Sequence, residues 1–317
     1  MKYLSLFSGI GGFELGIEHA FAKQKQKAVC VGFSEIDKYA AHVYAHHFPT
    51  HKNFGDITKI KANSLPDFDL LVGGFPCQSF SIAGKRKGFE DPRGQMFFHI
   101  ARILRAKRPR RFLLENVAGI LSHNEGATFR KIICEIEKLG YSVEWHVLNS
   151  ADYLPQHRTR VFIVGHLGKK RAGKVFPLER TVAKAHGTHQ PKTRSGIVTL
   201  YDGGFVDRKI ISPQGISPAI VATPKSIPNV AVSNSSNREF GWRTNYCPAL
   251  TASDSKSMKI VRIGCRIRKL LPVECARLQG FPDSWCDGLS DSQAYRCYGN
   301  AVTTNVVSAI VSKMYAR

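Results

Sequence analysis

The stretch YLSLFSGIGGF, residues 3–13, decides the fold class. Its first five residues form a short apolar run that is typical of a buried strand, and the glycines that follow predict a tight turn. Apolar residues then recur at helical spacing from Phe13 to Ala20. A strand joined to a helix by a glycine-rich turn predicts that the backbone approaches a ligand at the N-terminus of that helix.

The same alternation of strands and helices continues through the first half of the chain and predicts a parallel, doubly wound α/β sheet. The C-terminal stretch 298–315 returns to an apolar helical pattern, and we expect it to pack against this first domain. The further predicted strands are 28–33, 69–73, 111–114 and 161–164, and the predicted helices are 38–47, 97–106 and 128–139.

Length and charge constrain the class of protein and its partner. A chain of 317 residues, 43% hydrophobic and 22% charged, predicts a globular protein of about two domains and excludes disorder, collagen and coiled coil. The net charge of +22 favours a polyanionic partner, and nucleic acid is favoured over a membrane because no apolar stretch is long enough to span one. The N-terminus has no secretory signal pattern, so we expect a cytosolic protein.

The basic charge is concentrated in residues 166–275. This region holds 19 Lys and Arg against 6 Asp and Glu, a local net charge of +13, and it is rich in Pro, Ser, Gly and Asn. It has no long helical period, so a loop-rich β domain fits it best.

Cys77 is the candidate nucleophile among eight cysteines. The absence of a CxxC pair argues against a zinc ribbon or a thioredoxin-like site, and no metal site is predicted. Cys77 lies in GGFPCQSFS, residues 73–81, directly after an apolar strand, at the sheet edge where ligands bind in doubly wound folds. A thiolate there can act as a nucleophile near neutral pH, whereas most cysteines are inert buried side chains.

Polar residues follow the other strands as well. Glu35 comes after the second strand, where an acid can accept the hydroxyls of a ribose; a surface acid is the alternative. The spacing departs from the dinucleotide motif, because Glu14 stands where the third glycine would fall. Glu115 ends another apolar strand and could donate a proton or cap a helix. Arg158 and Arg160 precede a further strand, and taken alone they could be a solvated turn.

Together these segments resemble the ordered motifs of the DNA (cytosine-5) methyltransferase family. The match covers almost the whole chain outside the basic region, and so many motifs in one order exclude chance agreement. The matching segments are the cofactor turn at 7–13, Glu35, the adenine segment at 55–57, the nucleophile motif GFPCQSFS at 74–81, ENV at 115–117, QHRTR at 156–160, and the C-terminal motifs at 268–282 and 293–306.

The resemblance implies S-adenosylmethionine as the methyl donor and a cytosine in DNA, flipped out of the duplex, as the acceptor. Cys77 would add to C6 of the base, and Glu115 would contact N3 and the exocyclic amine. Arg158 would contact O2 of the base, and Arg160 would support the pocket or the phosphate. The implied cofactor-binding residues are Phe7, Gly9, Gly11, Gly12, Glu35, Ile36, Asp56, Ile57, Pro76, Met96, Asn300 and Ala301.

The resemblance also implies an organisation and a setting. Residues 1–167 with 290–317 would form a Rossmann-like catalytic domain that binds S-adenosylmethionine, and 168–289 a smaller, loop-rich β target-recognition domain. The expected partners are double-stranded DNA and a cognate restriction endonuclease acting on the same site, without a membrane, in the cytoplasm and associated with the nucleoid. The alternatives are an RNA (tRNA) cytosine-5 methyltransferase and a catalytically silent DNA-binding protein.

One question about recognition stays open at this point. Residues 217–222 and 247–252 repeat a similar Pro-Ala pattern, and the Thr-Leu pair that often closes the recognition region in the family is replaced by Ala249-Leu250 in the second segment. The sequence does not decide which of the two segments positions the target.

Overall fold

The computed structural model contains two compact units. Unit 1 comprises residues 1–149, 159–179 and 301–317, and unit 2 comprises 150–158 and 180–300. The division into a catalytic and a target-recognition domain is a functional one and stays a prediction. The residues that the structure describes are 1–76, 96–168, 175–178, 230–234, 247–248, 250, 252, 259–263 and 266–316.

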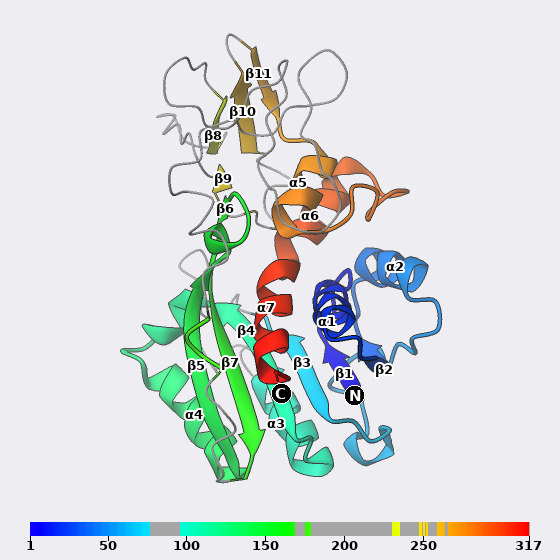
Figure 1. Cartoon of the computed structure of the whole chain (residues 1–317), viewed down its shortest axis with the longest axis vertical. Helices are drawn as coiled ribbons and strands as arrows, with labels where there is room; N and C mark the ends of the chain where they lie inside the picture. Colours follow the sequence, from blue (N-terminus) through cyan, green and yellow to red (C-terminus); the bar gives the residue numbers. More distant parts are fainter. Residues whose placement is uncertain are drawn as a thin grey trace. The chain divides into compact units, whose positions relative to one another are not determined.

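A six-stranded sheet forms the centre of unit 1, in the order β2-β1-β3-β4-β7-β5 (Figure 1). Strands β2, β1, β3 and β4 are parallel to their neighbours, whereas β7 runs antiparallel to both β4 and β5. The strands are β1 (Lys2–Leu6), β2 (Val29–Ser34), β3 (Leu70–Gly74), β4 (Arg111–Val117), β5 (Tyr141–Asn149) and β7 (Thr159–Leu167).

The doubly wound α/β fold is confirmed, but the expectation of a wholly parallel sheet is wrong at β7. Nine residues separate the end of β5 at Asn149 from the start of β7 at Thr159. A parallel pair of adjacent strands needs a crossover of a dozen or more residues, so a connection this short forces an antiparallel pair. Strand β5 was not predicted, although Tyr141, Val143 and Trp145 alternate with polar residues as in a strand exposed on one side.

The sheet buries side chains on both faces, which explains the continuous apolar runs in its strands. On β1, Leu4 and Leu6 join the core that also contains Phe97 and Ile132 from two helices, whereas the intervening side chains point to the other face. Helices that cover this core come from the segments between β3 and β5, as the doubly wound pattern requires.

Helices α1 and α7 pack against each other, although they lie at opposite ends of the sequence (Figure 1). A Cβ at Gly16 would lie 2.6 Å from the Val307 side chain, so glycine permits the close approach. None of the described helices is long and apolar enough to cross a membrane. The helices of unit 1 are α1 (Gly12–Lys23), α2 (Lys38–His47), α3 (Met96–Lys107), α4 (Ala127–Lys138) and α7 (Thr304–Met314), with short 3₁₀ turns η1 (Ala62–Ser64) and η3 (Ala118–Leu121).

The described part of unit 2 combines short strands with two helices. Strands β8, β10 and β11 form an antiparallel sheet, and β6 pairs with β9 in parallel. The stretch 298–315, predicted as one apolar helical pattern, is divided between the end of α6 in unit 2 and α7 in unit 1. The elements are η4 (Ser150–Asp152), β6 (Gln156–His157), β8 (Val230–Asn234), β9 (Cys247–Pro248), β10 (Lys259–Ile263), β11 (Arg266–Lys269), α5 (Pro272–Gln279) and α6 (Asp291–Asn300).

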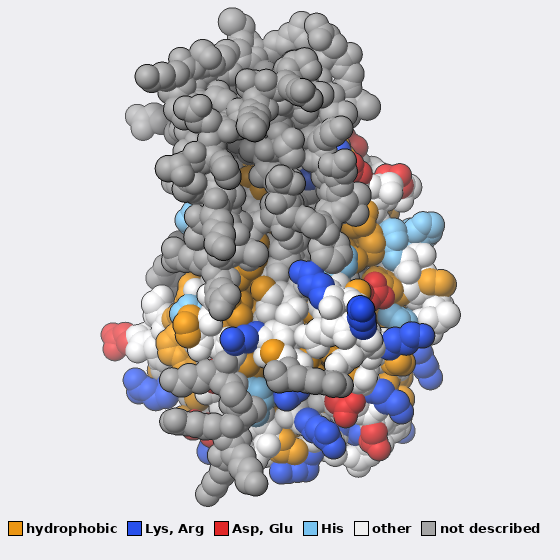
Figure 2. All heavy atoms as spheres, viewed as in Figure 1, with side chains coloured by type: hydrophobic (Ala, Val, Ile, Leu, Met, Phe, Trp, Pro, Cys, Tyr) orange, Lys and Arg blue, Asp and Glu red, His pale blue; other side chains and the backbone are white. Residues whose placement is uncertain are grey.

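Charged side chains of the described residues are spread over the visible face of unit 1. Figure 2 shows Lys and Arg interspersed with Asp and Glu there, without a single basic stripe. Most of the basic region 166–275 lies outside the described residues, so its expected contact with nucleic acid stays a prediction.

Candidate active site

The glycine-rich turn joins β1 to α1 in unit 1. Its backbone is left-handed at Phe7 (φ 52°), Gly9 (φ 56°) and Gly11 (φ 89°), and Gly11 caps α1. Apart from Gly9 and its two chain neighbours, no atom of the described residues lies within 4 Å of the position that a Cβ of Gly9 would take. The turn therefore leaves space beside Gly9, near the first residue of α1, Gly12, which suits a ligand that approaches the backbone.

Glu35, at the end of β2, is bonded to this turn. Its Oε2 accepts the backbone N–H of Gly9 at 2.8 Å, and its Oε1 accepts those of Ile36 and Asp37, each at 2.8 Å. A carboxylate has about four acceptor directions, so the group can hold the turn and still accept a ligand hydroxyl. This arrangement suits the ribose of a nucleoside cofactor.

The residues predicted to contact the adenine have different surroundings. Ile36 is 76% exposed, as suits a side chain that packs on a flat ring. Asp56 accepts the backbone N–H of Thr58 at 2.9 Å and its hydroxyl at 2.8 Å, and these bonds hold the pKa of Asp56 below its ordinary value. The side chain of Ile57, in contrast, is buried in the core of unit 1, where it serves packing.

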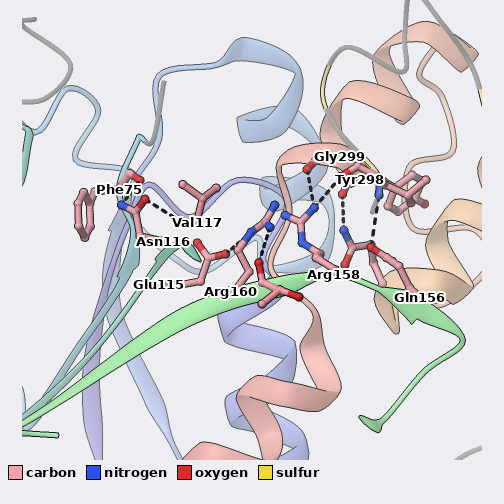
Figure 3. Close-up of polar contacts among 12 residues, drawn as sticks. Phe75, Glu115, Asn116, Val117, Gln156, Arg158, Arg160, Tyr298 and Gly299 are labelled. Atoms are coloured by element: carbon pink, nitrogen blue, oxygen red, sulfur yellow. Dashed lines mark hydrogen bonds and ion pairs between the residues drawn. The ribbon is translucent and has the colours of Figure 1, made fainter. Parts of the chain in front are cut away.

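Strand β3 leads through Phe75 and the half-buried Pro76 to Cys77. The carbonyl of Phe75 accepts the side-chain N–H of Asn116 at 3.2 Å, and the side-chain oxygen of Asn116 accepts the N–H of Val117 at 2.9 Å (Figure 3). This buried amide joins the ends of β3 and β4, and sequence analysis assigned it no role. Cys77 itself lies outside the described residues, so its role as nucleophile stays a prediction.

Glu115 precedes Asn116 on β4 and forms an ion pair with Arg160 on β7. The distance from Glu115 Oε1 to Arg160 Nε is 3.1 Å, and the two side chains are 12% and 18% exposed (Figure 3). The antiparallel register pairs Arg160 with Val117, two residues beyond Glu115, so the sheet itself brings the pair together. A Cβ at Gly74, the ladder partner of Glu115 on β3, would lie 3.1 Å from the other carboxylate oxygen.

Arg158 belongs to unit 2 and has a different environment from that of Arg160. It is 3% exposed, and its Nη1 donates to the carbonyl of Leu250 at 2.6 Å and to that of Gly299 at 3.2 Å (Figure 3). Its guanidinium is thus held by two backbone carbonyls within unit 2. From the sequence we expected Arg158 to contact the base and Arg160 to support the pocket. Nothing in the sequence indicated that the two side chains have such different surroundings.

Gln156, at the start of the same motif, is a buried polar residue to which sequence analysis gave no role. Its Nε2 donates to the carbonyl of Leu278 at 2.7 Å, and its Oε1 accepts the N–H of Leu250 at 3.4 Å. The β6–β9 ladder also pairs Gln156 with Cys247. Of the two repeated segments, 247–252 therefore contacts the QHRTR motif, whereas 217–222 lies outside the described residues.

The remaining predicted cofactor residues are divided between the units. Met96 begins α3 and packs, half-buried, against the core of unit 1. Asn300 ends α6 in unit 2, and Ala301, which is buried, is the first residue of the chain's return to unit 1. Within the part of the chain that the structure describes, no three His, Cys, Asp or Glu side chains gather as metal ligands would.

Comparison with known proteins identifies the family. The family model described as C-5 cytosine-specific DNA methylase matches residues 1–316. The chain belongs to this family. The methylase is 37% identical over 324 residues to Type II methyltransferase M.DsaV of Dactylococcopsis salina, covering 99% of this chain and 86% of that protein. It is 38% identical over 327 residues to M.NlaX of Neisseria lactamica, covering 99% and 96%.

Solved structures show the same fold at lower sequence identity. A DNA modification methyltransferase encoded within an E. coli prophage superposes with a TM-score of 0.66 at 22% identity, covering 99% of this chain and 98% of that one. The Dnmt2 methyltransferase of S. pombe gives a TM-score of 0.65 at 20% identity, with the same coverage of both chains. The family and the fold class predicted from the motifs are thus both confirmed.

Proposed function

We propose that this methylase transfers the methyl group of S-adenosylmethionine to C5 of a cytosine flipped out of a specific short sequence in double-stranded DNA. The observation that carries the proposal is the Glu115–Arg160 ion pair at the carboxyl end of β4. It lies beside Gly74, in the strand that leads to Cys77. A carboxylate and a nucleophile at one sheet edge are what addition to a cytosine ring requires.

The cofactor would be held by unit 1. When bound, S-adenosylmethionine supplies an electrophilic methyl group. Glu35 would accept a ribose hydroxyl beside the three N–H groups that it already holds, and Ile36 would pack on the adenine with Asp56 beside it. The open backbone at Gly9 supports this assignment, because a larger residue there would fill the space that a ligand needs. The further holding residues of unit 1 would be Phe7, Gly11, Gly12, the backbone of Ile57, Pro76, Met96 and Ala301, whereas Asn300, expected from the sequence, belongs to unit 2.

The chemistry would begin with Cys77. Its thiolate sulfur forms a bond to C6, and the C5=C6 electron pair becomes available at C5, which otherwise is a poor nucleophile. Glu115 would hold the proton at N3 and accept a hydrogen bond from the exocyclic amine, which stabilises the charge that develops on addition. After C5 has taken the methyl group, which leaves S-adenosylhomocysteine as the other product, C5 would lose its proton to water, the C5=C6 double bond would reform, and the sulfur would leave C6 as thiolate.

The surroundings of the two arginines favour an exchange of the roles expected from the sequence. Arg160, paired with Glu115, would contact O2 of the base, since it shares the sheet edge with that carboxylate. Arg158 would act within unit 2, where two carbonyls hold its guanidinium. The pairing with Glu115 also orients the carboxylate for the base.

The proposed setting follows from a DNA substrate. The protein would act in the cytoplasm on the nucleoid, and a restriction endonuclease that cleaves the same unmethylated site would be its functional partner. The names of the Type II relatives support this setting. The large basic excess of residues 166–275 suits contact with phosphates by the target-recognition domain.

The decisive experiment expresses the chain in a host free of DNA methylation and sequences the host genome for methylcytosine at single-base resolution. We expect 5-methylcytosine at one short recurring sequence. An unmodified genome in the presence of folded protein would contradict the proposal. Tritium transfer to tRNA would then separate an RNA methyltransferase from a silent DNA-binding protein.

A further inference from the structure

Two buried side chains of the QHRTR motif hold one residue of the recognition segment, which we define as residues 247–252. The N–H of Leu250 donates to Oε1 of Gln156 at 3.4 Å, and its carbonyl accepts from Nη1 of Arg158 at 2.6 Å. Gln156 is fully buried and Arg158 is 3% exposed. Both backbone polar groups of Leu250 are thus bonded to side chains that lie two positions apart in the motif.

The same two side chains also bind the helices of unit 2. Gln156 Nε2 donates to the carbonyl of Leu278 in α5 at 2.7 Å, and Arg158 Nη1 donates to that of Gly299 in α6 at 3.2 Å. The recognition segment is therefore connected to α5 and α6 through Gln156 and Arg158. All of these contacts lie within unit 2.

Among the described residues of the recognition segment, backbone pairing is limited to a short ladder. Strand β9 has two residues, and its ladder with β6 comprises two pairs. A short two-stranded pairing is marginally stable, whereas hydrogen-bond readout of base edges requires a rigid support. Buried side-chain bonds supply such support, because a buried backbone group left without a partner is costly.

We propose that Gln156 and Arg158 are positioning residues that fix the recognition segment and thereby set the discrimination between target and non-target DNA. They act through Leu250 and do not touch the base. This inference rests on the proposed function.

The test compares Gln156→Met with Gln279→Met in the full-length protein. Gln279 is a matched control because it is also fully buried in unit 2, and its Nε2 donates to the carbonyl of Tyr298 at 2.8 Å. The readout is kcat/KM for tritium transfer to a duplex with the site found by sequencing, divided by that for a duplex with one base pair of the site changed. Calorimetry measures the affinity for S-adenosylhomocysteine.

We expect Gln156→Met to lower this ratio by about tenfold, the order of one base-pair contact, and to leave cofactor affinity as in the wild type. Gln279→Met should keep the wild-type ratio. If Gln156→Met does not fold, Arg158→Lys gives the same reading, because the shorter lysine side chain cannot place its ammonium where Nη1 donates to both carbonyls.

Two results overturn the inference. An unchanged ratio in folded Gln156→Met or Arg158→Lys would show that the contacts do not control discrimination, while the proposed function would stand. An equal loss of discrimination in Gln279→Met would show that any destabilisation of unit 2 has the same effect. A wild type that methylates no DNA would instead contradict the proposed function itself.

Discussion

Unit 1 and unit 2 position their proposed site residues by different means. In unit 1, Glu115 and Arg160 stand on neighbouring strands of the six-stranded sheet, and the register of a seven-pair ladder brings them together. In the described part of unit 2, the backbone of Leu250 is held by the side chains of Gln156 and Arg158. A position fixed by a ladder depends on many backbone bonds, whereas a position fixed by side chains depends on a few residues.

This difference predicts how substitutions will act. In unit 1, a site side chain can be changed with little effect on the backbone, so that the change affects chemistry or cofactor binding. In unit 2, a change in a buried polar side chain should move the segment that it holds.

The largest expected effect is that of Cys77→Ser. A hydroxyl is a far weaker nucleophile than a thiolate near neutral pH, so methyl transfer should fall by at least about a thousandfold. DNA binding should survive, because the basic region lies elsewhere in the sequence. Single-turnover tritium transfer and fluorescence anisotropy with a labelled duplex measure the two properties. Turnover close to that of the wild type would refute the assignment of the nucleophile.

Glu115→Gln should lower kcat by about a hundredfold, since the amide cannot hold the charge and proton at N3 of the base. The sheet should keep its stability, because the ladder that carries residue 115 consists of backbone bonds. Chemical denaturation and steady-state methylation test both statements. The control is Glu137→Gln at an exposed position on α4, which should leave both unchanged. A large loss of stability in Glu115→Gln would contradict the view that backbone bonds, and not side chains, fix the site residues of unit 1.

Glu14→Gln tests a buried acid on α1. Burial raises the pKa of Glu14 from 4.5 to about 7, and its Oε1 accepts the hydroxyl of Tyr44 at 3.0 Å. The folded state therefore favours the protonated acid, and stability should fall by about 3 kcal/mol as the pH rises from 4.5 to 7, then level off. The titratable neighbours of Glu14 and Tyr44 are Tyr3, Glu18, Cys30 and His51.

The variant cannot ionise, so the difference between wild type and Glu14→Gln isolates this contribution from that of the neighbouring groups. Unfolding in urea at pH 5 and pH 8 measures it. Glu14→Gln should be the more stable protein at pH 8, and the gap should be much smaller at pH 5. An equal gap at both values would show that Glu14 does not titrate between them.

The smallest expected effect compares one glycine from each unit. Gly9 in unit 1 and Gly288 in unit 2 have φ of 56° and 86°, and no described atom lies within 4 Å of a Cβ added to either. Alanine at each position should cost about 1 kcal/mol of stability from backbone strain alone. Only Gly9→Ala should also weaken binding of S-adenosylhomocysteine, as calorimetry would show. Equal cofactor affinity in the two variants would argue against the cofactor turn.

Much of unit 1 could be predicted because its signals are local. Helix α2 has the predicted bounds, 38–47, and its start is fixed by Asp37, whose side chain accepts the N–H groups of Tyr39 and Ala40. Strand β5 was not predicted, although its apolar and polar residues alternate. It lies at the edge of the sheet and lacks the continuous apolar run by which the other strands were recognised. The predicted direction of β7 was wrong, because the direction of a strand depends on which strands lie beside it and on the length of the segment that joins them.

The fold class and the family could be predicted from the sequence alone, since the apolar periodicity, the glycine turns and the motifs are each local patterns of a few residues. Only the tertiary structure decided which groups meet. Gln156 and Leu250 lie 94 residues apart, and Arg158 and Arg160, with one residue between them, belong to different units. The physical reason is that long-range partners follow from strand register and packing, which no local pattern contains.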